Sequence, residues 1–526
     1  MYRRLLLVLP ILSFFNALGL QAQSVTWSRD VAPIIYSHCT TCHRSGEIGP
    51  FPLESYEDAT AWADMIAYTT QIRFMPPWKP DPTYGGAFIG TNRLTDQQIA
   101  TIKAWVDAGA PEGDPTEAPP PPTFPTGSQV GTPDVSLSFS SAHRVSATNT
   151  DEYRFFVLPT GLREDRDLVA LELRPGNTSL VHHALFWTDT TGTAAQLDAE
   201  TPEYGYVGRG AEAGQARFGD QLPSYVPGAR PIVYTQGMAQ KIPANSDIVI
   251  QMHYAPTTVG GTDSSTVNLF FSKTPARRYV RSHIMLPPAI VNGPFVMPPN
   301  SVTTFEGRFT TPIKVTLLGL APHAHLLNRS WKVYAVTPEQ DTIPLISIPD
   351  WDFNWQGSYH FAQPVVLPRG STIVAFATYD NTEANPFNPS IPPTTVRWGE
   401  GTTDEMFYLP FLWLPYQGGD EDLVLDDVPT SVESALTSEH DVRLYPLAPN
   451  PVRGPVTIGY TLDRTTAMTL EVYDMQGLRQ SIIRHDRKAL PGQHLVDWDT
   501  STLPAGMYRV VLRTNATMVS QALLVP

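Results

Sequence analysis

Cysteine is almost absent from this chain of 526 residues, which contains only Cys39 and Cys42. No disulfide framework can hold the domains together, so they must be stabilised by packing. After the N-terminus no apolar run reaches the roughly 20 residues needed to span a bilayer. Basic residues are also scarce, with 36 Lys and Arg against 51 Asp and Glu and a net charge of −15. This balance argues against nucleic acid and anionic membrane surfaces as partners, because both bind basic patches.

Proline, in contrast, is abundant. The chain has 51 prolines, about twice the average share, and 36 glycines. This composition favours many short strands and turns over long helices. The length leaves room for roughly three to four domains.

The first residues have the pattern of a signal peptide over 1–22. Two arginines precede the apolar run Leu5–Phe15, and the small residue Ala22 offers a cleavage site. A membrane anchor would need a longer run, and Asn16 interrupts this one. We therefore expect an exported protein that is secreted or held at the outer-membrane surface, with the periplasm as the alternative.

Changes in composition along the chain predict a multidomain protein that is mostly β. After the signal peptide we expect a small all-α domain, a Pro-rich linker, two all-β sandwiches of jelly-roll type, an acidic linker and a small C-terminal β-sandwich. The expected boundaries are 24–110, 111–127, 128–272, 273–417, 418–441 and 442–526.

Individual elements can also be predicted. Helical spacing covers Tyr56–Thr69 and Thr95–Ala108, and Thr95 begins a capping motif. Runs rich in β-branched and aromatic residues, bounded by turn residues, predict strands. These runs are Ile248–Tyr254, Lys314–Leu320, Lys332–Val336 and Thr372–Tyr379.

The sequence Cys39-Thr40-Thr41-Cys42-His43 is a C-x-x-C-H motif. At this spacing two thiols can bond the two vinyl groups of one haem while the adjacent imidazole binds the iron. A disulfide across two residues would be strained and would leave His43 unexplained. The segment resembles small cytochrome c domains, which implies one covalently bound haem c.

A low-spin haem needs a sixth ligand, and methionine raises its potential. Met75, in a loop fixed by two prolines, is the candidate. Met65 is the alternative, although its helical setting favours a core position. We expect His38 to lie on a helix surface.

Five more histidines fall in three short motifs: His182-His183, His253, and His323-Ala324-His325. At a spacing of two, His323 and His325 would point to one face of a strand and could chelate one metal ion. His182 and His183 would point to opposite faces of a regular strand. Sharing a metal would require a bulge or a strand end there.

The order of these motifs, followed by Met406 in Gly401-Thr402-Thr403-Asp404-Glu405-Met406, resembles the copper type II, ascorbate-dependent monooxygenases. The resemblance implies two sandwiches facing one another across a solvent cleft. One copper ion would be held by His182, His183 and His253. The second copper ion, where catalysis occurs, would be held by His323, His325 and Met406. Imidazole suits both copper oxidation states, and a thioether favours Cu(I).

The resemblance implies hydroxylation of a substrate C–H bond with O2 and two electrons supplied singly. The haem would replace or supplement ascorbate as the reductant, and an external donor would reduce the haem. The substrate would be a small molecule or a peptide. A C-terminal glycine peptide is not expected, because Ala321 stands where the peptide-amidating branch has Arg, and Tyr408 and Pro410 stand where it has Asn and Tyr.

Two alternatives remain at this point. The chain could be a haem and copper electron-transfer or copper-binding surface protein without monooxygenase activity, or an adhesin without copper. His143, His283 and His360 are interpreted as structural or surface residues.

The last 85 or so residues carry a further ordered set of motifs. Leu444–Pro446, Val472–Gly477 and Leu503–Tyr508 together resemble the C-terminal sorting domain of type IX secretion substrates. This resemblance implies recognition by the type IX secretion machinery. The alternative is an ordinary carbohydrate-binding or adhesion sandwich.

Overall fold

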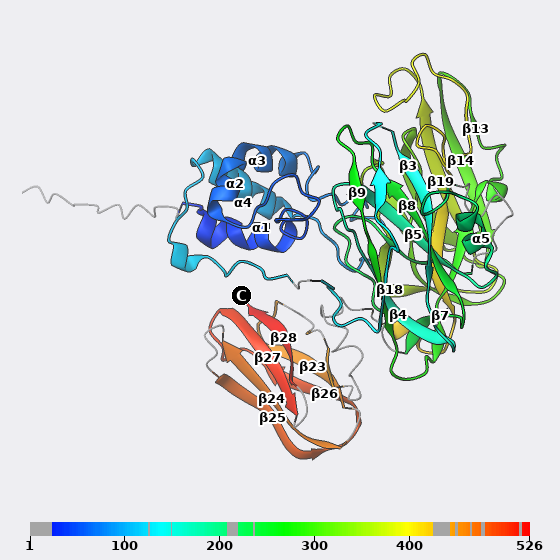
Figure 1. Cartoon of the computed structure of the whole chain (residues 1–526). Coiled ribbons are helices and arrows are strands. Elements are labelled where there is room, and N and C mark those ends of the chain that lie inside the picture. The colour runs from blue at the N-terminus through cyan, green and yellow to red at the C-terminus, as the bar shows by residue number, and fades with distance from the viewer. Residues whose placement is uncertain are drawn as a thin grey trace, which may run out of the picture.

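The computed structural model is dominated by β-strands, with few helices (Figure 1). It describes residues 24–124, 127–148, 150–207, 219–234, 237–423, 425, 442–445, 447, 451–462, 465–474, 479–514 and 518–526. The expected signal peptide and most of the expected acidic linker lie outside these residues. Among the described helices, none has the length and apolar character needed to cross a membrane.

A helical region comes first along the chain. It consists of η1 (Trp27–Val31), α1 (Ala32–His38), α2 (Tyr56–Ala61), α3 (Ala63–Gln71) and α4 (Asp96–Asp107). Trp27, Ile35 and Trp105 are fully or almost fully buried in its core. The predicted capping motif is confirmed, because the Thr95 hydroxyl accepts from the Gln98 N–H and the Gln98 side chain accepts in return. The predicted helix over 56–69 is instead two helices that meet at Trp62.

Within the described residues, four other helical segments are short and lie outside this region. They are η2 (Pro115–Glu117), α5 (Thr193–Ala199), η4 (Pro287–Ala289) and η5 (Asp420–Asp422).

The first β region packs two sheets around one core, which contains Phe156, Phe186 and Tyr254. One sheet has the order β3-β8-β5-β6 and the other β1-β10-β4-β7-β11, with β2 and β9 as a separate pair. The strands are β1 (Val135–Ser138), β2 (His143–Val145), β3 (Glu152–Pro159), β4 (Arg166–Arg174), β5 (Val181–Asp189), β6 (Leu222–Tyr225), β7 (Met238–Ile242), β8 (Asp247–Tyr254), β9 (Gly261–Asp263), β10 (Thr266–Phe271) and β11 (Arg278–Tyr279).

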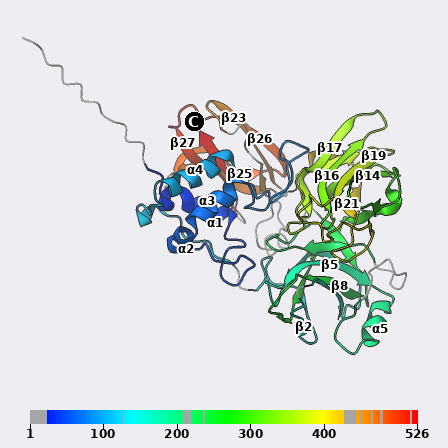
Figure 2. The same cartoon turned by 90° about the horizontal axis from the view of Figure 1, so that it is seen from above.

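The second β region lies beside the first (Figure 2) and has its own core around Trp331, Phe361 and Phe407. Its sheets have the orders β12-β21-β15-β18 and β14-β19-β16-β17, with β13 and β20 as a pair. The strands are β12 (Arg281–Met285), β13 (Val296–Met297), β14 (Ser301–Thr310), β15 (Val315–Leu320), β16 (Asn328–Val336), β17 (Thr342–Ile348), β18 (Tyr359–Leu367), β19 (Thr372–Asn381), β20 (Val396–Arg397) and β21 (Leu409–Pro415). The four strands predicted from composition correspond to β8, β15, β16 and β19.

The C-terminal region is a smaller sandwich of two antiparallel sheets, β22-β23-β26 and β25-β24-β27-β28. Tyr460, Leu470 and Leu512 are buried between them. The strands are β22 (Arg443–Leu444), β23 (Pro455–Leu462), β24 (Thr466–Asp474), β25 (Arg479–Ala489), β26 (Gly492–Asp499), β27 (Gly506–Thr514) and β28 (Met518–Val525).

Candidate metal and haem sites

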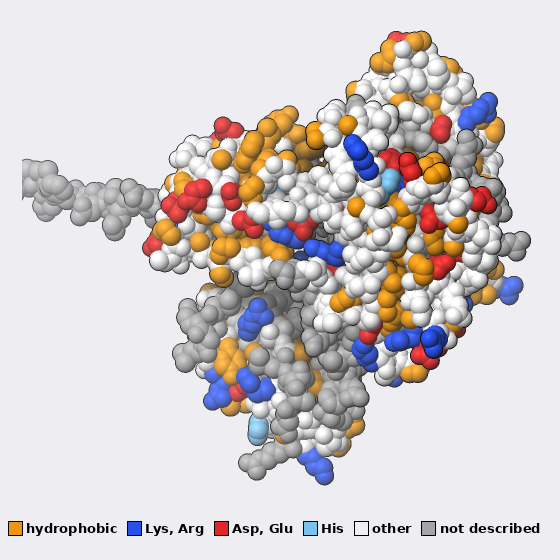
Figure 3. Space-filling view, in the orientation of Figure 1, with side chains coloured by type: hydrophobic (Ala, Val, Ile, Leu, Met, Phe, Trp, Pro, Cys, Tyr) orange, Lys and Arg blue, Asp and Glu red, His pale blue; other side chains and the backbone are white. Residues whose placement is uncertain are grey.

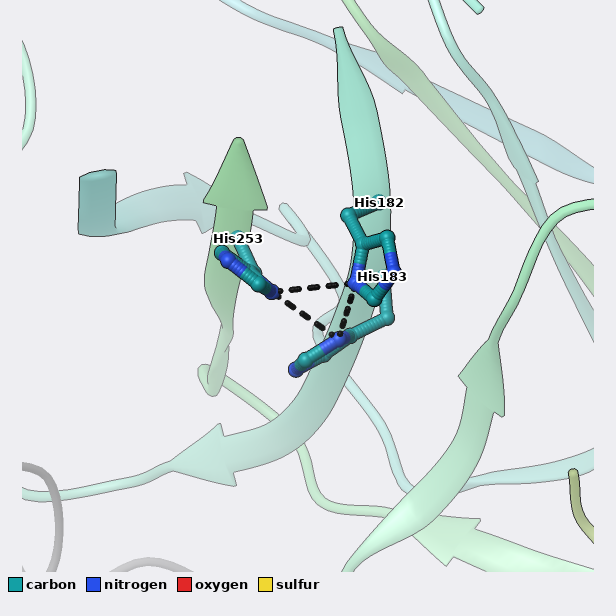
Figure 4. Close-up of side chains that lie close together, drawn as sticks. All are labelled: His182, His183 and His253. Atoms are coloured by element: carbon teal, nitrogen blue, oxygen red, sulfur yellow. Dashed lines mark hydrogen bonds between the residues drawn. The ribbon is translucent and has the colours of Figure 1, made fainter. Parts of the chain in front are cut away.

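Three histidines meet between the neighbouring strands β5 and β8 (Figure 4). His183 and His253 are directly opposite one another, and the pairing register shifts between Val181 and His183. This bulge lets His182 and His183 contribute to one site although they are adjacent in sequence. The Nδ1 atoms are 3.2 Å apart for His182 and His183, 3.1 Å for His182 and His253, and 3.2 Å for His183 and His253. We call this group the three-histidine cluster.

The three-histidine cluster has the donor set of a metal site. Burial, together with the neighbouring rings, lowers the pKa of His183 well below its ordinary value, and burial lowers that of His182 to about 4. Both rings are therefore neutral near pH 7, and their Nδ1 atoms face one another. Within the described residues, Nε2 of His182 is buried without a hydrogen-bond partner. Hydrogen bonding within the protein therefore does not account for the burial of this polar ring. The three Nδ1 atoms are close enough together to bind one cation, and imidazole suits copper.

Asp151 orients the third ring of the cluster. His253 Nε2–H donates to Asp151 Oδ1 at 2.6 Å, which leaves Nδ1 free for a metal. Burial acts to raise the pKa of Asp151, but hydrogen bonds from His253 and Thr402 outweigh it, and the net pKa is lowered. Tyr153 stacks on the His253 ring with centroids 4.2 Å apart. Sequence reasoning missed Asp151, which gives no signal in the polar stretch before β3.

His323 and His325 lie beyond the end of β15, so the prediction that they share a face of a regular strand is wrong. An isolated bridge joins His323 to Tyr408, with backbone hydrogen bonds in both directions, and the next N–H groups, of His325 and Leu327, donate to the Glu405 side chain instead of to a strand. The two rings are nevertheless close, with centroids 5.3 Å apart. His325 Nδ1–H donates to the Asp404 carbonyl oxygen at 3.1 Å, which leaves Nε2 free. Burial lowers the pKa of His325 to about 4, and burial, together with the neighbouring His325 ring, lowers that of His323 well below its ordinary value.

Glu405 connects the segment that carries His323 and His325 to the segment that carries Met406 through hydrogen bonds. Its Oε2 accepts from the backbone N–H of His325 at 2.9 Å and of Met406 at 3.0 Å, and its Oε1 accepts from the Leu327 N–H at 2.7 Å. The Tyr379 hydroxyl donates to the Met406 carbonyl at 2.7 Å. Burial raises the pKa of Glu405 to about 8, against the lowering effect of these amides. The sequence motif drew attention to Met406 but not to this buried carboxyl group.

The two histidine groups are in contact with one another, which differs from the expected solvent cleft. The ring centroids of His183 and His323 are 5.8 Å apart. Phe353 lies between the groups, with its ring 5.5 Å from His182 and 5.8 Å from His325. The two β regions are held together here by hydrogen bonds of Tyr153 with Thr402 (3.0 Å), Tyr408 with Gln221 (2.9 Å) and Gln251 with Glu400 (3.3 Å). Tyr408 therefore joins the two regions in this state.

The C-x-x-C-H motif forms a turn at the end of α1. The N–H groups of Cys42 and His43 both donate to the Cys39 carbonyl, and both cysteines are free thiols. His43 Nδ1–H donates to the Phe51 carbonyl oxygen at 3.1 Å, which leaves Nε2 for another ligand. Burial lowers the pKa of His43, so its ring is neutral at pH 7. These features fit haem attachment.

An exposed apolar surface lies on the same helical region (Figure 3). Met65, Tyr68 and Ile72 are on one face of α3 and its extension, and Trp62 and Phe74 flank them; all five are largely exposed. Trp62 stacks on Phe51, which in turn contacts His43. A haem macrocycle could cover such a surface. Met65 is 49% exposed, so the expectation that it lies in the core is wrong.

The remaining predicted residues have clear positions. Met75 is half-buried, and its N–H donates to the Thr69 carbonyl. His38 is half-buried at the end of α1 and contacts Asn92. His143 bonds Glu152 and His283 packs on Phe309, away from the two histidine groups. His360 is buried on β18.

Comparison with known proteins gives little for most of the chain. No curated protein sequence matches it. Among solved structures, the β-glucuronidases of Faecalibacterium prausnitzii and Lactobacillus rhamnosus are 12% and 8% identical, each with a TM-score of 0.13 over 43% of this chain and 37% and 36% of theirs. A Ruminococcus gnavus β-glucuronidase is 10% identical, with a TM-score of 0.14; the match covers 48% of this chain and 45% of that structure. The chain thus spans less than half of these structures, and the likenesses carry no argument.

The C-terminal sandwich gives a specific match. Residues 446–526 match the family model of the secretion system C-terminal sorting domain. This match confirms the resemblance seen in the order of motifs from Leu444 onward. The chain therefore ends in a C-terminal sorting domain, and the protein is exported by type IX secretion to the cell surface or beyond it.

Proposed function

We propose that the protein is an exported copper-dependent monooxygenase that receives electrons one at a time through a fused c-type haem. The observation that carries this proposal is the convergence of three imidazole nitrogens within 3.2 Å, beside a second histidine pair held next to a methionine segment. Under this proposal residues 24–110 form a cytochrome c domain, and 128–417 form the two-copper core.

Each side chain of the core has a definite task in this proposal. Asp151 keeps the proton of His253 on Nε2, and the Asp404 carbonyl keeps that of His325 on Nδ1. The opposite nitrogen of each ring is thereby free to bind metal. Glu405 fixes the spacing between His325 and Met406, and burial keeps bulk water away. Copper bound by these residues would supply one-electron chemistry and react with O2 in its reduced state.

The helical region would supply the electron carrier. The thiols of Cys39 and Cys42 would form the two thioether bonds, and Nε2 of His43 would bind the iron. Met75 is the proposed sixth ligand.

A second candidate function is electron transfer or copper storage without hydroxylation. The contact between the two histidine groups favours it, because His183, His253 and His325 are buried and the rings of His183 and His323 are 5.8 Å apart. The monooxygenase proposal requires the two β regions to separate enough to admit substrate.

Copper content is the first test. Purified, haem-loaded protein should contain about two copper ions per chain, and His323→Ala should lower this to one. The matched control is His283→Ala, since His283 packs on Phe309 and Phe411 outside the groups. No copper in the wild type, or equal copper in both variants, would contradict the site assignment.

Oxygen consumption then separates the two candidates. A monooxygenase consumes O2 with a reductant and a C–H substrate and releases a hydroxylated product. Two bound copper ions with no substrate-dependent O2 uptake across a broad substrate panel would favour the electron-transfer role.

A further inference from the structure

A segment of the helical region pairs with β18 of the second β region. The Ile89 N–H donates to the His360 carbonyl at 2.8 Å, and the neighbouring Phe88 ring stacks on Phe361 with centroids 5.3 Å apart. Phe88 is part of the buried core of the second β region, and Trp78 packs against the same core. Backbone pairing and shared apolar packing therefore fix the helical region on the second β region.

A loop of the first β region reaches the C-x-x-C-H motif itself. Gly228, between β6 and β7, lies so close to Cys42 that a Cβ atom added to this glycine would be 2.4 Å from the Cys42 sulphur. That distance is far shorter than van der Waals contact, and the φ of +75° also favours glycine. A free thiol can rotate away from such a Cβ atom, but a sulphur bonded to haem cannot, because the thioether fixes its position.

A cavity of about 380 Å³ lies beside this contact, where the helical region meets both β regions. Its lining includes Cys42 from the helical region, Gly228 and Arg230 from the first β region, and Trp355 and Tyr359 from the second. A smaller cavity of about 120 Å³ shares Gly228 and Arg230 with it. Because Cys42 borders the larger cavity, the edge of a haem bonded to its sulphur would lie there as well.

We propose that the two β regions complete the haem site on its Cys42 side, where Gly228 leaves room for the thioether and Arg230 is a cation beside the haem edge. The helical region alone would leave this edge in water, whereas Gly228, Trp355 and Tyr359 cover it in the full chain. A side chain at position 228 would push the haem-loaded helical region away from the first β region. This inference rests on the haem of the proposed function and does not depend on copper.

The reduction potential of the haem in the full, haem-loaded chain tests this placement, by spectroelectrochemical titration at low ionic strength. Gly228→Ala should expose the haem edge to water, which stabilises the more highly charged ferric state and lowers the potential. Gly161→Ala is the matched control, because Gly161 lies in the same β region with a φ of +66° and no atom within 4 Å of an added Cβ. This control has a similar backbone strain without the contact and should keep the wild-type potential.

A second pair of variants tests the same placement through charge, without a change in buried packing. Arg230 is exposed, and its replacement in Arg230→Gln removes a cation beside the haem edge and should lower the potential. Arg163→Gln, at an exposed position of the same β region that lines neither cavity, should leave the potential unchanged.

Equal potentials within either pair of variants would overturn the proposal. Loss of covalent haem from Gly228→Ala but not from Gly161→Ala would support it, since position 228 then limits attachment, and Arg230→Gln must still lower the potential. Absence of covalent haem from the wild type would instead refute the haem assignment of the proposed function.

Discussion

Replacing Asp151 by Asn tests whether the three-histidine cluster binds metal. The Asp151 carboxylate accepts from His253 Nε2–H at 2.6 Å and is mostly buried. Asn has nearly the same shape but no charge, so the ring loses its anionic partner while packing is retained. Partners of this kind typically change metal affinity by about 10- to 100-fold, or roughly 1.4 to 2.7 kcal/mol. We expect copper affinity at one of two sites to fall by that amount.

Equilibrium dialysis against chelator-buffered copper, with bound metal counted by mass spectrometry, resolves the two sites. The matched control is Asp165→Asn, since Asp165 is half exposed and pairs with Lys241 on the surface. The wild type and this control should give the same two-step isotherm. Asp151→Asn should weaken one step and leave the unfolding temperature of the metal-free protein nearly unchanged.

Two results would refute this reasoning. An Asp151→Asn isotherm identical to the wild type would mean that the carboxylate does not orient a metal ligand. An equal loss at both steps would mean that Asp151 acts on the junction between the β regions through Thr402, and not on His253.

Four further predictions concern protons, packing, haem and export. Because the pKa values of His182 and His325 are lowered to about 4, the unfolded chain binds more protons than the folded chain below the ordinary histidine value. The metal-free unfolding temperature should therefore fall as pH drops from about 6.5 to about 4, and calorimetry checks this. Glu405→Ala leaves three buried amides without their acceptor and should destabilise the fold by about 3 kcal/mol or more, with a lower unfolding temperature, whereas exposed Glu203→Ala should not. Haem should stay on the wild-type chain in denaturing gels and be lost from the double variant Cys39→Ala, Cys42→Ala. Deletion of 446–526 should keep the protein out of the medium and off the cell surface, as cell fractionation would show.

Local patterns in the sequence predicted the elements that depend on near neighbours. Thr95 caps α4 because the partner of its hydroxyl is three residues away. Strands β8 and β19 were predictable because their β-branched and aromatic residues repeat within a few positions. The same reasoning failed for His323 and His325, because the N–H groups of His325 and Leu327 donate to the distant Glu405 side chain instead of to a neighbouring strand. It also failed for Met65, because a helical period does not say which face is covered.

Sequence patterns could not predict the oxygen partners of the candidate ligand histidines. Asp151 is separated from His253 by 102 positions, and Glu405 from the His325 amide by 80. A polar stretch that contains an acidic residue looks in sequence like a solvated turn. The burial of that residue depends on the tertiary fold. The bulge at His182 is a similar case. The sequence showed that the adjacent residues His182 and His183 could share a metal ion only if the strand were irregular there, but whether a bulge forms depends on the pairing between β5 and β8.

One device recurs at all three candidate redox groups. His43, His253 and His325 each donate one ring N–H to a fixed oxygen, at 3.1, 2.6 and 3.1 Å, and so fix the ring orientation and the tautomer. The other nitrogen of each ring is then an acceptor, available to a hydrogen-bond donor or to a metal ion. For His253 that acceptor is 3.1 Å from Nδ1 of His182 and 3.2 Å from Nδ1 of His183. A single cation could bind all three Nδ1 atoms, and this convergence is the physical ground for proposing these histidines as ligands.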